Sequence, residues 1–137
     1  MAKTLDMASL LKATRQCSLS GLKMLVVEDE TIISFLLEDM LSNLGCDKVA
    51  LASNVGDALD EIDKAAPDAA VLDVNLGGEM VYPVAERLNA AKVPFIFTTG
   101  YGRGGIKFEW ATNPVVQKPF NIDTLAKALG SVLQARA

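Results

Sequence analysis

The sequence predicts an α/β domain built on a doubly wound, five-stranded parallel sheet. Short apolar runs alternate five times with segments of helical periodicity, which is the pattern of a parallel sheet covered by helices. The runs are almost continuously apolar, as in strands that are buried on both faces. The chain of 137 residues has the length of about one domain, and its 50% hydrophobic residues can fill one core.

The first half of the domain contains two strand–helix units. Residues 22–27 form the first predicted strand, which ends abruptly at the acidic residues 28–30. The next helix ends at Gly45, a typical C-terminal glycine. Its apolar positions follow helical spacing: Ile32, Ile33, Leu36, Leu37, Met40, Leu41 and Leu44. A second strand at 48–51 and a helix over 55–62, with Ser53 or Asn54 as its cap, complete this half.

The second half contains three strands. The third predicted strand covers 69–73 and precedes a loop at 75–78; the fourth covers 93–99 and the fifth 114–117. Pro83 suits the first turn of a helix, and Asn121 can cap a final helix over 122–133. Residues 101–112 are rich in glycine and carry only a weak helical signal. Within them, Trp110 either packs against the sheet or forms an exposed patch for a partner.

Residues 1–20 are interpreted as an N-terminal arm with some helical character, and residues 21–137 as the domain proper. Ser18, Ser20 and Gly21 interrupt the apolar pattern between the two parts. The start of the chain lacks a secretory signal, and no apolar run approaches the ~18–20 residues that span a bilayer. Cys17 and Cys46 form no CxxC pair, which favours free thiols in a reducing, cytoplasmic environment.

Composition excludes several kinds of chemistry. The chain has no histidine, so it contains neither a Ser-His-Asp triad, nor an HExxH metal site, nor a C2H2 finger. Its net charge of −4 argues against a nucleic-acid partner, which usually requires a basic surface. Any chemistry must therefore depend on carboxylates, hydroxyls, lysines or thiols.

The ends of the predicted strands carry such groups. Strand one ends at Glu28 and Asp29, strand three at Asp73, strand four at Thr99 and strand five at Lys118. In an open doubly wound sheet these carboxyl ends meet at one edge. Clustered carboxylates suit Mg²⁺, and a carboxylate beside the metal can accept a phosphoryl group.

Each of these residues taken singly is also explained as a solvated loop, capping or surface residue. Their order and their shared place at strand ends favour one site. Pro119 directly after Lys118 indicates a tight turn, with a cis peptide bond as one option.

Four motifs resemble the receiver domain of two-component response regulators. They are Val26-Val27-Glu28-Asp29, Val71-Leu72-Asp73, Phe97-Thr98-Thr99-Gly100 and Gln117-Lys118-Pro119-Phe120, and the resemblance covers roughly residues 22–135. It implies a flavodoxin-like fold with the strand order 2-1-3-4-5. It also implies a stand-alone receiver, since Ala137 comes directly after the last predicted helix.

The resemblance implies a role for each matching residue. Asp73 resembles the phosphoacceptor, and Asp29 resembles the direct Mg²⁺ ligand, with Glu28 acting through water. Asn75 would offer its backbone carbonyl to the metal. Thr99 resembles the switch hydroxyl, and Lys118 the lysine that pairs with the phosphoryl group.

Three departures from the usual receiver pattern stand out. The Met-Pro pair that commonly follows the acceptor is replaced by Leu76-Gly77, and Val115 stands where many receivers carry an aromatic switch. The segment between Thr99 and Lys118 is short and glycine-rich. Residues 94–102 are similar to the "FATGUY" subclass, which implies a short or mobile fourth helix. Tyr101 is then the candidate for a switch aromatic, with a half-exposed loop residue as the equal alternative.

The implied function is that of a magnesium-binding phosphoprotein in a phosphorelay. A histidine kinase would phosphorylate Asp73, and a downstream protein target would recognise the result; the protein would not be an enzyme for any external substrate. One alternative is a receiver-like interaction module that works without phosphorylation. Another is a Mg²⁺-dependent aspartyl-phosphate phosphohydrolase, but those enzymes usually carry a second Asp where this chain has Asn75. The sequence gives no information on oligomeric state.

Overall fold

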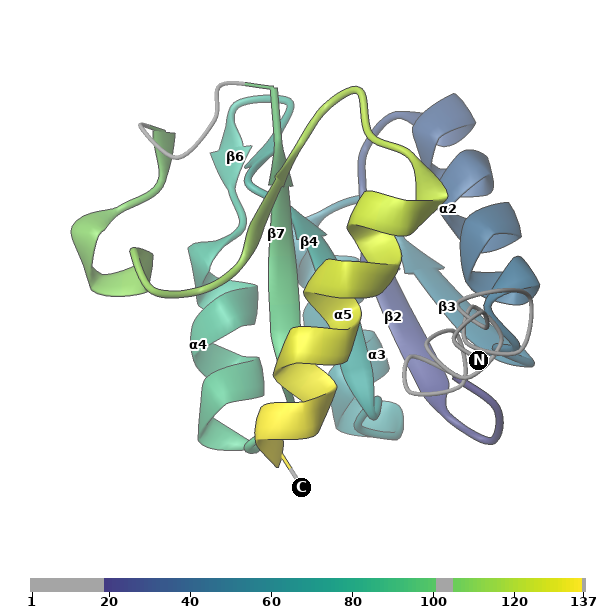
Figure 1. Cartoon of the computed structure of the whole chain (residues 1–137). Coiled ribbons are helices and arrows are strands. Elements are labelled where there is room, and N and C mark those ends of the chain that lie inside the picture. The colour runs from purple at the N-terminus through teal and green to yellow at the C-terminus, as the bar shows by residue number, and fades with distance from the viewer. Residues whose placement is uncertain (1–18, 101–104, 137) are drawn as a thin grey trace, which may run out of the picture.

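The computed structural model describes residues 19–100 and 105–136. Its main elements alternate between strand and helix, as predicted (Figure 1). In chain order they are β2 (Lys23–Val27), α2 (Thr31–Asn43), β3 (Lys48–Ala52), α3 (Val55–Lys64), β4 (Ala69–Asp73), β5 (Asn75–Leu76), β6 (Glu79–Met80), α4 (Tyr82–Ala90), β7 (Phe95–Thr99), the 3-10 helix η2 (Phe108–Trp110), β8 (Val115–Gln117) and α5 (Ile122–Arg136).

Five strands form one parallel sheet in the order β3-β2-β4-β7-β8. Counted along the chain within this sheet, the order is 2-1-3-4-5, so the predicted topology is confirmed. The order reverses at β2, because the chain turns first outward to β3 and then returns to β4 on the other side. Such a reversal opens a crevice at the carboxyl ends of the central strands.

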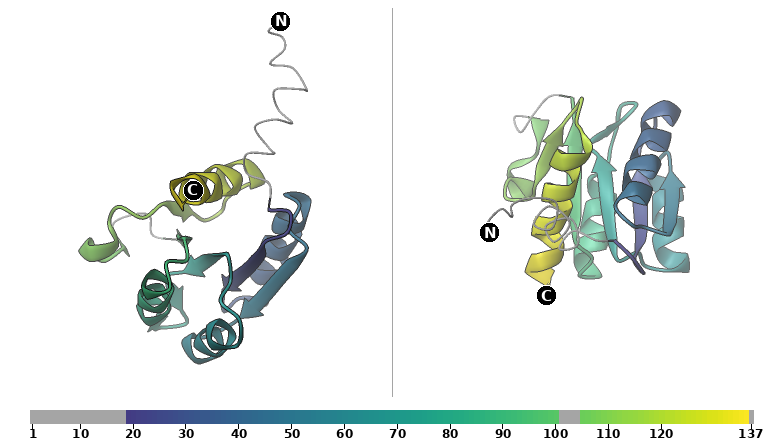
Figure 2. Two further views of the ribbon diagram at one scale, coloured as in Figure 1. Left: turned by 90° about the horizontal axis from the view of Figure 1, so that it is seen from below. Right: turned by 45° about the vertical axis from the view of Figure 1, so that its right-hand side comes forward.

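Helices cover both faces of the sheet (Figure 2). On one face, α3 and α4 pack against alternate residues of the strands, including Leu25, Leu72 and Phe97. On the other face, α2 and α5 pack against Met24 and Val71, among others. All five residues of β4 and of β7 are buried, which agrees with the continuous apolar runs that predicted these strands.

Trp110 packs against the sheet. Its side chain is buried and lies edge-on to Phe95 and Phe97, with ring centroids 5.7 Å and 6.2 Å apart. The hydroxyl of Tyr82 accepts a hydrogen bond from the Lys107 amide (3.1 Å) and donates one to the Gly105 carbonyl (3.4 Å). These contacts attach the segment before β8 to α4 although its only described helix is the three-residue η2. Within residues 105–114, the helix expected between the fourth and fifth strands of the sheet is thus reduced to the short η2.

Two details differ from the sequence prediction. The expected loop at 75–78 is part of a small antiparallel hairpin, in which Asn75 pairs with Met80 and Leu76 with Glu79. The apolar pattern of α2 is wider than its buried face, because Ile32 is 83% and Leu36 45% exposed. Hydrophobic spacing predicts which helix positions can be buried, but the width of the neighbouring sheet and helices decides which are.

The N-terminal arm falls mostly outside the described residues, and the boundary after residue 20 stays a prediction. Leu19 is fully buried beside α2, and its amide donates to the Leu44 carbonyl at 3.1 Å. Within residues 19–100 and 105–136, none of the helices combines the length and the hydropathy that crossing a bilayer requires.

Candidate functional site

The sheet register brings the predicted site residues to one edge. Val27 pairs with Leu72, so Glu28 and Asp29 follow directly beside Asp73. Asp73 in turn pairs with Thr98, the neighbour of Thr99. The Lys118 amide donates to the Thr99 carbonyl at 2.8 Å, which continues the β7–β8 ladder to the predicted lysine. Four chain segments therefore meet at the carboxyl ends of β2, β4, β7 and β8.

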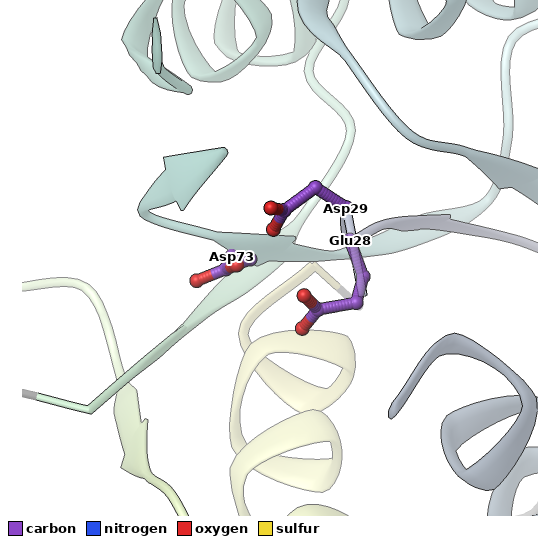
Figure 3. A group of neighbouring side chains, drawn as sticks. All are labelled: Glu28, Asp29 and Asp73. Carbon is purple, nitrogen blue, oxygen red and sulfur yellow. The ribbon is translucent and has the colours of Figure 1, made fainter. Parts of the chain in front are cut away.

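Three carboxyl groups lie at this edge, those of Glu28, Asp29 and Asp73 (Figure 3). One oxygen of each lies within 4.8 Å of the others. Glu28 and Asp73 are buried, with exposed fractions of 2% and 5%, whereas Asp29 is exposed. Because burial removes the water that would screen these charges, the cluster is strained electrostatically unless a cation lies nearby.

Lys118 supplies one positive charge. Its Nζ lies 2.9 Å from Oε1 of Glu28 and 3.3 Å from Oδ2 of Asp73. The second carboxylate oxygen of Glu28 accepts a hydrogen bond from the Glu30 amide at 3.1 Å. Burial acts to lower the pKa of Lys118, but its contacts with Glu28 and Asp73 outweigh this effect and raise that pKa. Lys118 is therefore a charged bridge between the two buried carboxyl groups. The Lys118–Pro119 bond that follows it is cis.

The charge of Lys118 does not balance the site. Burial, followed by the nearby charge of Glu28, raises the pKa of Asp73 from 3.8 to about 7, even though Lys118 acts in the opposite direction. A carboxyl group with this pKa is only partly ionised at neutral pH. A further cation beside Asp73 would favour its ionised form.

The donor set fits a hard divalent cation. Three carboxylates offer oxygen ligands only, and burial together with the charge of Glu28 raises the pKa of Asp73, so a nearby cation would stabilise the ionised form of Asp73. Mg²⁺ prefers one or two carboxylates, water and phosphate oxygens to a complete protein cage. The residues present are therefore compatible with the magnesium ion that the sequence predicted.

A cleft of about 580 Å³ opens above these groups. Its lining consists of Asp29, Glu30, Asp73, Asn75, Gly77, Gly78, Thr99, Gly100 and Lys118. Thr99 is 3% exposed and lines this cleft together with Asp73 and Lys118, as the sequence predicted. Tyr101, the candidate switch aromatic, lies outside the described residues.

The β5–β6 hairpin forms one wall of the cleft. Its turn is closed by a 2.6 Å hydrogen bond from the Gly78 amide to Oδ1 of Asn75. Gly77 has φ +67°, and a Cβ at this position would lie 3.4 Å from Oδ2 of Asp29. Beyond the turn, Oε1 of Glu79 accepts a hydrogen bond from the Val55 amide at 3.1 Å.

Sequence reasoning missed the contributions of Gly77 and Glu79. The glycine pair after Asn75 signalled a turn, but nothing in the sequence indicated that this turn comes close to Asp29. The contact of Glu79 spans 24 residues along the chain and has no local signature.

Comparison with known proteins agrees with this geometry. The family profile described as "Response regulator receiver domain" matches residues 24–130. The sensory transduction protein LytT of Bacillus subtilis is 30% identical over 112 residues. That match covers 79% of this chain and 46% of LytT, so the chain spans about half the length of this curated relative.

Solved structures give the same result. The solution structure of SdrG from Sphingomonas melonis Fr1 is 43% identical, with a TM-score of 0.74, over 82% of this chain and 96% of that one. The BeF3-activated conformation of SdrG is 44% identical, with a TM-score of 0.71, over 81% and 95%. The receiver domain of the PhyR response regulator from Erythrobacter litoralis is 28% identical, with a TM-score of 0.75, over 85% and 92%.

Proposed function

The chain belongs to the response regulator receiver domain family, and on that premise we propose that it takes a phosphoryl group from a histidine kinase onto Asp73. Receiver domains are generally signalling modules without an external substrate, and their signalling depends on phosphorylation. The observation that carries the proposal is the meeting of Asp73 with Asp29 and Lys118 at one open cleft, with the buried Glu28 beside them.

Asp73 is the proposed nucleophile. Its Oδ atom forms a bond to phosphorus while the bond between phosphorus and the imidazole nitrogen of the kinase breaks, which gives an acyl phosphate on Asp73 and a free imidazole. Only the ionised carboxylate attacks. Because the raised pKa of Asp73 lowers its ionised fraction at neutral pH, a cation that favours the ionised form also favours the reaction.

Asp29, Asp73 and the backbone carbonyl of Asn75 are the proposed Mg²⁺ ligands, with Glu28 acting through water. A metal held by these residues would supply positive charge to stabilise the phosphoryl oxygens in the transition state. This ligand set explains why the three carboxyl groups lie together although they repel one another.

Lys118 and Thr99 are the proposed partners of the transferred group. Lys118 bridges Glu28 and Asp73 in the structure, so its ammonium already lies beside the acceptor and can bind a phosphoryl oxygen by a small rotation. The hydroxyl of Thr99 can donate to another of these oxygens from β7. Tyr101 stays the candidate switch aromatic that responds to this change.

The proposed output is contact with a downstream protein target after phosphorylation. The partners are then two proteins, a kinase and a target, and the proposed site of action is the cytoplasm. One of the similar SdrG structures is that of a BeF3-activated conformation. A comparable change in this chain is part of the proposal.

The test is intact-mass analysis after incubation with acetyl phosphate. The wild-type chain should gain one phosphoryl group with Mg²⁺ and none without it. Asp73→Asn should gain none under either condition, with an unchanged circular dichroism spectrum as evidence that it is folded. Labelling of Asp73→Asn to the wild-type extent, or equal labelling of wild type without metal, would refute the assignment.

A further inference from the structure

Three sets of hydrogen bonds hold the β5–β6 hairpin, and the set at its tip lies within the hairpin itself. At its base, the Val74 amide donates to the Thr98 carbonyl (3.0 Å), and the Val81 amide donates to the Val74 carbonyl (3.0 Å). At its tip, the Gly78 amide donates to Asn75 (2.6 Å). At its side, Glu79 accepts from the Val55 amide, the first residue of α3.

The side attachment is the only one of these three that reaches a different layer of the fold. Burial anchors the β5 side of the hairpin, since Leu76 is buried in the core. Strand β6 is two residues long and both of its residues are exposed, so burial contributes little to holding β6. A hydrogen bond to a charged group stabilises a fold more than one between two neutral groups. Glu79 also places a negative charge at the N-terminus of α3, where the helix dipole favours it.

The position of the hairpin matters for the acidic cluster. Between Asn75 and Glu79, Gly77 lies so close to Asp29 that a Cβ there would contact Oδ2 at 3.4 Å. The same hairpin carries the Asn75 carbonyl, a proposed ligand of the metal. A shift of the hairpin by a few tenths of an ångström would therefore move the Asn75 carbonyl and change the space available to the Asp29 carboxylate.

We propose that Glu79 is a positioning residue for the magnesium site, because its hydrogen bond to the Val55 amide fixes the β5–β6 hairpin, and with it Asn75 and Gly77, against Asp29. Glu79 does not touch the metal in this proposal. Its carboxyl oxygen is engaged with α3, and the cleft lining does not include it. The inference rests on the proposed function, since it assumes that the cluster binds Mg²⁺.

Three variants separate positioning from simple stabilisation of α3. Glu79→Ala removes the acceptor, whereas Glu79→Gln retains an Oε1 that can accept from Val55. Asn54→Ala is the matched control: Oδ1 of Asn54 accepts from the Asp57 amide at 2.8 Å and caps the same helix, and Nδ2 of Asn54 donates to the Asp57 side chain. Its loss should cost about as much stability as the loss of the Glu79 contact.

The measurement is Mg²⁺ affinity by isothermal titration calorimetry on the full chain, together with amide hydrogen exchange without metal. Glu79→Ala should bind Mg²⁺ about tenfold more weakly and show faster exchange at Gly78 and Val81. Glu79→Gln and Asn54→Ala should stay within about twofold of wild-type affinity.

The outcomes distinguish this inference from the proposed function. If wild type binds no Mg²⁺, the proposed function fails. If wild type binds and Glu79→Ala binds equally well, only the role of Glu79 fails. Equal weakening in Asn54→Ala and Glu79→Ala would also overturn it, because the effect would then come from the stability of α3.

Discussion

At the scale of single residues, Asp73 carries the largest electrostatic cost in the site. Its pKa of about 7 in the fold exceeds the value of 3.8 that it would have when exposed. The folded chain therefore holds a proton on Asp73 over a pH range in which the unfolded chain has released it. Protonation of Asp73 therefore stabilises the folded chain in this range, and this stabilisation is lost as the pH rises toward 7.

This gap predicts that Asp73→Asn stabilises the metal-free chain at pH 8, by roughly 1–3 kcal/mol, because the amide carries no charge to bury. The advantage should shrink as the pH falls from about 7 to about 4. It should vanish below about pH 4, where Asp73 is protonated in both the folded and the unfolded chain. Urea unfolding at several pH values checks this. A difference between variant and wild type that does not change with pH would contradict it.

Lys118 has the opposite effect on the stability of the site. Lys118→Met should destabilise the chain by about 2–4 kcal/mol at pH 8, since it leaves Glu28 buried without its ion-pair partner. Lys64→Met is the control, because Lys64 is 75% exposed and its contact with Glu61 is worth at most ~1 kcal/mol. Thermal unfolding of both variants measures the difference. Similar losses in the two would show that Lys118 contributes no more than a surface lysine.

At the scale of secondary structure elements, the conformation of the hairpin turn depends on Gly77. Gly77→Ala should cost about 1–2 kcal/mol, since φ is +67° there, and should also weaken Mg²⁺ binding through the contact with Asp29. Gly56→Ala, in the first turn of α3, should instead stabilise the chain by up to ~1 kcal/mol. Denaturant midpoints of the two variants should therefore move in opposite directions; movement in the same direction would refute the account of the turn.

The sequence predicted the larger elements well. The apolar runs at 69–73 and 93–99 identified β4 and β7, because a strand buried on both faces has a strong local signal. The hairpin was missed, since strands of two residues are too short to show alternation. The short η2 agrees with the weak helical signal after Thr99, and long-range contacts of Tyr82 and Trp110 hold it in place.

The candidate site was predictable for a related reason. The side chains concerned all lie at or directly after the carboxyl end of a strand, and a parallel sheet brings these ends together whatever the detailed packing. They are Glu28, Asp29, Asp73, Thr99 and Lys118. The sequence could not show that Lys118 bridges two carboxyl groups or that Glu79 reaches α3, because both depend on side-chain geometry.

At the scale of the whole molecule, Mg²⁺ should act as a stabiliser of the fold. A ligand that binds only the native state stabilises it by about 2.7 kcal/mol at a hundred times its Kd. We expect a rise in Tm with Mg²⁺ that is larger at pH 8 than at pH 5, because the carboxyl groups must be ionised to bind the metal. Calorimetric scans test this, with NaCl at equal ionic strength as the control. An equal rise with NaCl would contradict specific binding.

The aromatic cluster under the sheet has a practical consequence. Trp110 is the single tryptophan of the chain, and it touches two rings of β7, the strand that ends in the cleft at Thr99. Indole emission responds to the polarity and the quenching groups around it. The protein thus carries its own optical reporter, and a stopped-flow trace at the emission wavelength of this one side chain could follow events at Asp73 without any attached dye.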